Sequence, residues 1–215
     1  MLATTETLME KGFKNQIIKD WDVASIFEGS PARRYALINK ALKKGEIEHL
    51  CRGLYMLGPK YRSQSISKYF VASRMVSSSY ISLETALAYH GLIPERVNIV
   101  RSIIAKGRTR RFNTSLGEFD YIKIPIREYE FLTGVLRQES NGNPFLIASP
   151  LRALLDMVYV QKIKWQGLNF MVEGLRIELD DLCTLKSCDF DELTKVYSSK
   201  RVLNFLQLLR KTLEK

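Results

Sequence analysis

Apolar residues recur at helical spacing in two short segments near the N-terminus. Asp22 is expected to cap the first segment, an amphipathic helix over 23–27, and Gly29 ends it. Ser30 is expected to cap the second helix, which runs from Pro31 to about Lys44, because proline tolerates the first helical position. The apolar positions that this second helix is expected to bury are Tyr35, Ile38, Ala41 and Leu42.

A hairpin is predicted directly after this second helix. The strand-like runs 46–51 and 54–57 are separated by Arg52-Gly53, where glycine supplies the backbone conformation of a tight turn. A short helix, a break, a capped basic helix and a hairpin, in this order, indicate a winged helix-turn-helix. The residues expected to support its basic helix from behind are Phe27, Ile38, Leu42, Leu50 and Leu54.

The sequence Gly58-Pro59-Lys60 marks the expected boundary between two domains, over 1–60 and 61–215. The fold class that follows is α+β: an N-terminal winged helix-turn-helix followed by a mixed α/β domain. In the second domain, helices are predicted over 64–75, 82–89, 150–160 and 202–213, and strands over 98–105, 112–114, 119–124 and 145–148.

Charge is distributed unevenly along the chain. The 215 residues include 33 lysines and arginines against 23 acids, which gives a net charge of +10. Eight cations and two acids lie within 31–62, six cations and no acid within 96–111, and seven acids against two cations within 173–192. Because neutralisation of phosphates supplies much of the affinity of basic proteins for DNA, the basic segments are expected to meet a polyanion.

The predicted helix over 31–44 has side chains suited to reading DNA. Arginine can pair with guanine, and asparagine with adenine, through two hydrogen bonds, while the first-turn amides of a helix can hold a phosphate. Arg52 at the hairpin turn is expected to reach phosphates or the minor groove. A solvated basic helix on a protein-binding winged helix is the alternative. The expected DNA contacts are Ser30, Arg33, Arg34, Asn39, Lys40, Lys43 and Arg52.

Cysteine usage and apolar content bear on the compartment. The three cysteines, Cys51, Cys183 and Cys188, are odd in number and scattered, which argues against a disulfide framework and a structural zinc and favours buried or half-buried thiols. No apolar stretch is long enough to cross a membrane, and the N-terminal residues lack the apolar segment of a secretory signal. A cytoplasmic location is therefore expected.

The sequence contains few residue patterns that are typical of catalytic sites. No Gly-rich phosphate loop of the required spacing is present, so we expect no enzyme, no metal and no cofactor. Asp120 and Lys123 on one predicted strand resemble part of a nuclease site, but a magnesium nuclease requires more convergent carboxylates. His90, beside Gly91 at a predicted helix end, is interpreted as a structural histidine.

Several segments resemble the AbiEi-type antitoxins, the transcription-repressing antitoxins of type IV toxin–antitoxin systems. The similarity covers nearly the whole chain from about Asp22, and its most specific part is the block over 79–95. It departs from the family pattern after Pro150, where Leu151 and Arg152 stand in place of an acidic and a basic residue. The segments that carry the similarity are 43–47 (KKGEI), 52–55 (RGLY), 79–95 (SYISLETALAYHGLIPE), 107–112 (GRTRRF), 147–150 (IASP) and 153–156 (ALLD).

This resemblance implies two activities. The N-terminal domain would bind inverted repeats in duplex DNA at its own promoter and repress transcription. The second domain would counteract a toxin with a nucleotidyltransferase fold without forming a stable complex with it. Membrane association is not expected, and the oligomeric state stays open, with monomers that pair on DNA as one arrangement.

A second basic group is predicted on a hairpin in the second domain. Like charges that cluster often mark an interaction surface, so this group is expected to contact DNA or to serve antitoxicity, with a solvated turn as the alternative. Three other functions stay open for the chain: a winged-helix regulator unrelated to toxins whose second domain senses a ligand or dimerises, a nuclease, and a protein adaptor. The members of the second basic group are Lys106, Arg108, Arg110 and Arg111.

Overall fold

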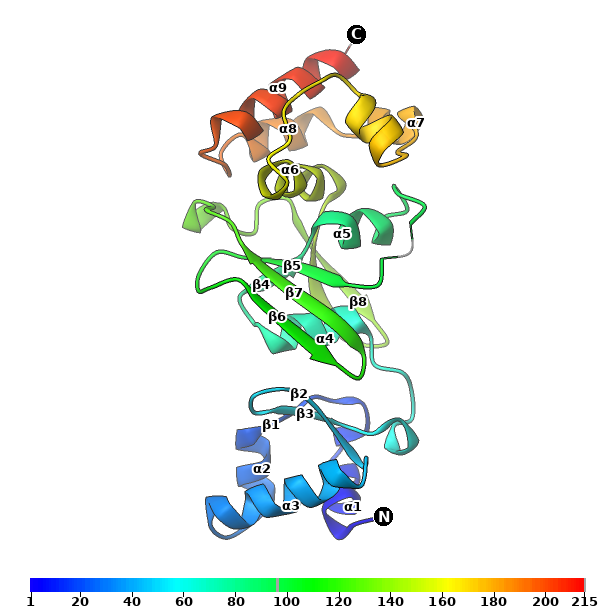
Figure 1. Cartoon of the computed structure of the whole chain (residues 1–215), viewed down its shortest axis with the longest axis vertical. Coiled ribbons are helices and arrows are strands. Elements are labelled where there is room, and N and C mark those ends of the chain that lie inside the picture. Colours follow the sequence, from blue (N-terminus) through cyan, green and yellow to red (C-terminus); the bar gives the residue numbers. More distant parts are fainter. Residues whose placement is uncertain (96, 215) are drawn as a thin grey trace.

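The computed structural model describes residues 1–95 and 97–214 as two units stacked along one long axis (Figure 1). The N-terminal unit, residues 1–64, lies at one end, because Tyr61 packs on its core and Arg62, Ser63 and Gln64 hydrogen-bond to it, and the sheet unit, residues 65–214, makes up the rest. Arg96, one of the six cations within 96–111, lies outside the described residues. No helix within the described ranges combines the length and the apolar character that crossing a membrane requires.

The N-terminal unit contains three helices and a small antiparallel sheet. The sheet has the strand order β1-β3-β2. The helices enclose a cluster of buried apolar side chains that includes Leu8, Val23 and Ile38. The elements are α1 (Ala3–Glu10), η1 (Phe13–Asn15), β1 (Ile18–Lys19), α2 (Asp20–Ile26), α3 (Pro31–Lys43), β2 (Ile47–Cys51) and β3 (Leu54–Leu57).

The local signals for α3 and the hairpin are confirmed. The Ser30 hydroxyl accepts a hydrogen bond from the Arg33 backbone N–H at 3.3 Å, as expected of a helix N-cap. The cap predicted for the preceding helix is wrong, because α2 begins two residues before Asp22. The Asp22 carboxylate instead accepts the backbone N–H of Lys19 at 2.8 Å from inside the first turn.

Two predictions about buried residues of the N-terminal unit are also wrong. The Tyr35 side chain is 68% exposed and is not part of the core, although Ile38 is buried as expected. Leu50 and Leu54 do not support α3, because they lie on the other face of the hairpin. Both contact the large apolar cluster of the sheet unit. The hairpin therefore separates two cores.

The sheet unit is built on a mixed six-stranded sheet with the order β6-β7-β5-β4-β9-β8. The pairs β5–β7 and β4–β9 are parallel, and the other three are antiparallel. Strands β4 and β8 are not foreseen from the sequence. After η2 (Pro59–Tyr61), which packs on the N-terminal unit, the elements are α4 (Lys68–Met75), β4 (Ser79–Ile81), α5 (Leu83–Tyr89), β5 (Val100–Ile104), β6 (Arg110–Thr114), β7 (Gly117–Lys123), η3 (Glu128–Glu130), β8 (Val135–Ser140), β9 (Asn143–Ala148), α6 (Pro150–Val160), η4 (Phe170–Gly174), α7 (Leu179–Cys183), α8 (Ser187–Leu193) and α9 (Lys200–Leu213).

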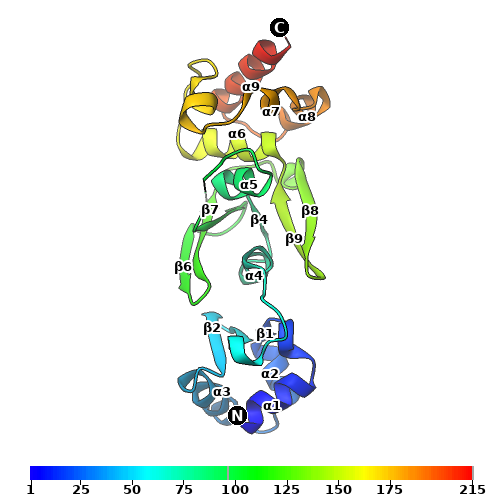
Figure 2. The same cartoon turned by 90° about the vertical axis from the view of Figure 1, so that its right-hand side faces the viewer.

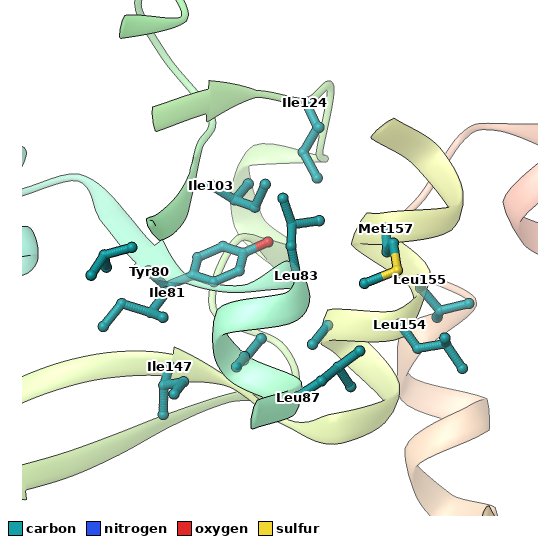
Figure 3. Close-up of a cluster of buried hydrophobic side chains, with 14 of the residues drawn as sticks. Tyr80, Ile81, Leu83, Leu87, Ile103, Ile124, Ile147, Leu154, Leu155 and Met157 are labelled. Atoms are coloured by element: carbon teal, nitrogen blue, oxygen red, sulfur yellow. The ribbon is translucent and has the colours of Figure 1, made fainter. Parts of the chain in front are cut away.

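Helices cover both faces of this sheet. Helix α4 lies on the side toward the N-terminal unit, while α5 and α6 lie on the opposite side with α7, α8 and α9 beyond them (Figure 2). Figure 3 shows Leu83 and Leu87 of α5 beside Leu154 and Leu155 of α6 in the core between helices and sheet. The fold is therefore a mixed α+β arrangement with two separate sheets.

The large cluster extends into the N-terminal unit. Ile17, Leu50, Cys51 and Met56 are buried and belong to the same contiguous cluster as the side chains of the sheet unit. Strand β6 also lies against β2 in both views (Figures 1 and 2). The two units are thus joined by packing as well as by the chain between them.

Candidate nucleic-acid interface

One face of α3 is cationic and open to solvent. Arg33, Lys40 and Lys43 are exposed, and their spacing of seven and three residues places them on the same side of the helix. Ala36 and the partly buried Leu37 lie between Arg33 and Lys40, and the small side chain of Ala36 is the one on the side toward Lys43. Ile38 and the other buried residues of α3 face the opposite way.

The cations of this face are not neutralised within the chain. Among the salt bridges of the described residues, none involves Arg33, Lys40 or Lys43. Helix α3 lies on the side of the N-terminal unit that points away from the sheet unit (Figure 1). The face is therefore accessible to a large anionic partner, and Ser30 places the first-turn amides of α3 at its end.

Arg34 and Asn39 lie closer to the body of the protein than the other expected contacts. The Arg34 guanidinium donates a hydrogen bond to the Gly29 carbonyl, and its side chain lines a hollow of about 270 Å³ beside Tyr35 and Tyr55. Arg34 is half-buried and therefore less open to solvent than Arg33, Lys40 and Lys43. Asn39 is half-buried at the margin of that face.

The turn between β2 and β3 is tightly fitted against the start of α2. Gly53 has φ +72°, and a Cβ added there would lie 2.6 Å from an Asp20 carboxylate oxygen. The Asp20 backbone N–H also donates to the Gly53 carbonyl at 3.0 Å. Arg52, the neighbouring turn residue, is exposed. The fit of this turn therefore fixes the backbone from which Arg52 projects.

The second basic group lies next to this turn. Strand β6, which begins at Arg110, lies against β2 (Figure 2). Burial raises the pKa of the Cys51 thiol, and the positive charge of Arg110 opposes this rise, which places the guanidinium near the buried sulfur. The structure thus brings the end of the hairpin and the start of β6 together, although 58 residues separate Arg52 from Arg110.

Two members of the second basic group are paired with acids that lie outside the acid-free segment 96–111. Lys106 Nζ lies 2.5 Å from a Glu128 carboxylate oxygen. Arg111 donates two hydrogen bonds to Asp120, at 2.6 and 2.9 Å, and these bonds raise the pKa of the guanidinium. The exposed cations of this group that have no carboxylate partner among the described residues are Arg108 and Arg110.

The structure also shows the environments of the other residues singled out in the sequence. His90 is structural as expected, because its Nε2 lies 2.8 Å from the Ala148 carbonyl oxygen. Asp120 is engaged by Arg111 and is not grouped with further carboxylates. Cys51 is a buried thiol, whereas Cys183 and Cys188 are exposed, so the expectation of buried or half-buried thiols is wrong for these two. Within residues 1–95 and 97–214, no group of three or more histidines, cysteines or acids is placed to hold a metal ion.

Sequence reasoning missed a fully buried ionic network beneath α6. Arg152 and Asp156 are both 0% exposed. The Asp156 carboxylate accepts hydrogen bonds from Tyr80 at 2.9 Å, Ser82 at 2.7 Å and Tyr197 at 2.6 Å. Arg152 donates to the Tyr80 hydroxyl at 2.8 Å and to a backbone carbonyl at 3.1 Å. The only sequence signal is the spacing of Arg152 and Asp156 by four residues on an otherwise apolar helix.

Burial and charge act together on the groups of this network. Burial raises the pKa values of Tyr80 and Tyr197 well above the usual range, and the nearby charge of Asp156 raises them further. Burial alone would lower the pKa of Arg152, but Asp156, Tyr197 and Tyr80 together outweigh this effect and raise it. The network therefore holds two neutral tyrosines around an ion pair and joins the sheet to the C-terminal helices.

Neither a scan against models of protein families nor a search of curated proteins returns a match for the sequence.

Proposed function

We propose that the protein is a DNA-binding transcriptional autorepressor and the antitoxin of a type IV toxin–antitoxin system. In this proposal it binds inverted repeats in duplex DNA at its own promoter and counteracts a nucleotidyltransferase-like toxin without a stable complex. It acts in the cytoplasm and is not an enzyme. The antitoxin part rests on the resemblance of the segments over 79–95 and 147–156 to the AbiEi-type family.

The observation that carries the DNA-binding part is the exposed cationic face of α3. Arg33, Lys40 and Lys43 project from a helix capped by Ser30, without carboxylate partners among the described residues. The order α2, α3, β2 and β3 supports a winged helix-turn-helix, in which α3 would enter the major groove and the hairpin would be the wing. The small side chain of Ala36 would let the helix approach the bases closely.

The second basic group supports an extended contact with DNA. The wing would be short, but Arg108 and Arg110 lie beyond its turn on the neighbouring unit and would continue its contact along the phosphates. Lys106 and Arg111 would contribute less, because each is already paired with an acid. In the proposed complex, the wing of the N-terminal unit and strand β6 of the sheet unit therefore form one surface.

The decisive experiment measures repression and antitoxicity in the same variants. The double variant Lys40→Ala/Lys43→Ala should lose binding to the DNA upstream of its own gene in gel shifts and should still rescue growth when a neighbouring toxin gene is expressed. Lys211→Ala, an exposed lysine of α9 at the opposite end of the molecule, is the matched control. Full binding by the double variant would reject the role of α3, and failure of the unaltered protein to rescue growth would reject the antitoxin role.

Point variants suit this experiment better than removal of residues 1–60. Such a deletion would take Ile17, Leu50, Cys51 and Met56 out of the large cluster and expose apolar surface on the sheet unit. A loss of rescue by the truncated chain would then report misfolding rather than function.

A second candidate function is favoured by one specific observation. The sheet unit has a hollow of about 400 Å³, within the usual size range of ligand pockets, with apolar walls that include Ile93, Val97 and Leu175 and with Glu84 and Arg101 at its side. A winged-helix regulator unrelated to toxins, whose second domain senses a small ligand, would use such a hollow. A thermal-shift screen with metabolites, followed by gel shifts in the presence of any hit, separates this function from the first.

A further inference from the structure

Two hollows adjoin on the face of α4 that does not touch β6. The first, the tryptophan hollow, has a volume of about 230 Å³ and lies between α4 and the start of α2. The second, the serine hollow, has a volume of about 290 Å³ and lies between α4 and the β8–β9 hairpin. Arg74 of α4 lines both hollows, so the two meet at this residue and are together called the cleft.

The tryptophan hollow has an exposed aromatic ring. Trp21 is 66% exposed, although it belongs to the most apolar class of side chains. Lys19 Nζ lies 4.2 Å from the centroid of the indole ring, close enough for a cation–π interaction. Gln16 adds an amide to the same wall. The ammonium group covers one face of the ring, so a flat, electron-rich group can stack on the other face.

The serine hollow combines two kinds of wall. Arg74 and Arg137 supply guanidinium groups, while the rest of the wall is formed by serines and apolar side chains. The hydroxyls of Ser73 and Ser79 already donate to backbone carbonyls, at 2.7 and 2.6 Å, so the two guanidinium groups are the main donors for phosphate oxygens, whereas the apolar wall suits a ring. The residues that complete this hollow are Ser73, Ser77, Ser79, Pro144, Phe145 and Leu146.

The cations that line the cleft have no acidic partner among the described residues, and one of them, Arg74, is held against an aromatic ring. The Arg74 guanidinium lies 5.0 Å from the ring of Phe70, which is one helical turn earlier and only 2% exposed. Among the salt bridges within residues 1–95 and 97–214, none involves Lys19, Arg74 or Arg137. The single acid that lines the cleft is Asp22, whose carboxylate is engaged by a backbone N–H.

We propose that this cleft binds single-stranded nucleic acid. A base stacks on Trp21, the phosphates that follow contact Arg74 and Arg137, and the next base lies against the apolar wall formed by β9. An exposed aromatic ring combined with a cationic track is the chemistry by which single strands are held without sequence preference. The cleft uses none of the residues assigned above to duplex DNA, so it is independent of the proposed repressor function.

The dimensions and chemistry favour a single strand over other anionic partners. The hollows, of about 230 and 290 Å³, are of a size to take separate bases, whereas a double helix keeps its bases stacked inside and offers none to the indole ring. An acidic peptide would satisfy the arginines, but it would make no use of the indole ring and the apolar wall. Duplex DNA and an acidic peptide are therefore used as unlabelled competitors of the single strand in the binding experiment.

The experiment titrates the full-length protein into a labelled single-stranded oligonucleotide of about 10 nucleotides, within the site sizes common for such grooves. The Trp165→Phe variant leaves Trp21 as the only tryptophan, because the chain has two. We expect binding to quench the Trp21 fluorescence. Trp21→Ala should weaken binding by roughly tenfold, which is the usual effect of losing one stacked base, and Trp21→Phe should retain most of the affinity.

The arginines are tested through the salt dependence. Arg74→Ala and Arg137→Ala should each weaken binding and lower the slope of log K against log salt by about 0.7, the value for one phosphate contact on a single strand. Lys211→Ala is the matched control and should change neither quantity. Lys40→Ala, which lies on α3, should leave single-strand binding intact.

Four results would overturn the proposal. They are no binding of the oligonucleotide at low salt, unchanged affinity in both arginine variants, equal competition by an unlabelled duplex with loss of binding in Lys40→Ala, and equal competition by polyglutamate. The third result would assign the single strand to the α3 surface, and the fourth would reduce the cleft to a nonspecific cationic surface.

Discussion

The salt dependence expected of the proposed duplex binding follows from which cations the structure leaves unpaired. Six exposed cations on α3, the hairpin turn and the second basic group have no carboxylate partner among the described residues. Each phosphate contact contributes about 0.9 to the slope of log K against log salt, so six contacts predict a slope of about −5. Affinity should then fall roughly a thousandfold between about 50 and 200 mM salt. The six are Arg33, Lys40, Lys43, Arg52, Arg108 and Arg110.

The same calculation gives a different value if pairing and burial are ignored. Counting Arg34, Lys106 and Arg111 as well would predict a slope of about −8. The assay is a fluorescence-anisotropy titration of the DNA upstream of the gene at several salt concentrations. Lys40→Ala/Lys43→Ala should lower the slope by about 2. A wild-type slope near −8 would mean that Arg34, Lys106 and Arg111 also contact phosphates, and it would refute their exclusion. An unchanged slope in the double variant would refute contact through α3.

Three further predictions concern stability and are tested by urea denaturation. Asp156→Ala leaves Arg152 buried without its partner and should lower the free energy of unfolding by about 3–5 kcal/mol. The control Glu192→Ala, at an exposed position, should change it by less than about 0.5 kcal/mol. Equal effects of the two substitutions would contradict the role of the network. Gly53→Ala should cost more than about 1 kcal/mol, because its φ is positive and the new Cβ would collide with Asp20. Burial raises the pKa of Tyr121, so its contribution to stability is complete below about pH 10 and is lost as pH rises further, at about 1.4 kcal/mol per pH unit. Tyr121→Phe should therefore make the decline of stability above about pH 10 less steep, and an unchanged decline would contradict this assignment.

Local signals predicted the elements of the N-terminal unit well and their packing less well. The cap at Ser30 and the glycine of the hairpin turn act over a few residues, so the sequence identifies α3 and the two strands. Tyr35 lies three residues before Ile38, about 60° away around the helix, at the edge of the apolar face. Whether such an edge is covered depends on neighbouring elements, and no local pattern contains that information.

The ion pairs of the second basic group could likewise not be predicted from the local sequence. Its partners are distant in sequence, because Glu128 follows Lys106 by 22 residues and Asp120 follows Arg111 by nine. The pairing of Arg111 with Asp120 depends on the register of β6 against β7, in which these two residues are opposite each other. Strand β8 was missed because its central residues are polar, as suits the edge of a sheet.

The continuous cluster that runs from Ile17 and Leu50 into the sheet unit leaves little freedom for a hinge between the units. Tightly packed interiors transmit displacement rather than absorb it, so the distance between α3 and β6 is set before any DNA arrives. In the proposed complex with DNA, the protein would therefore measure a fixed interval along the double helix. Inserting half a helical turn of DNA between the part of the operator contacted by α3 and the part contacted by β6 should therefore rotate one of them out of reach of the protein. Inserting a full turn would restore their rotational phase but not the distance between them.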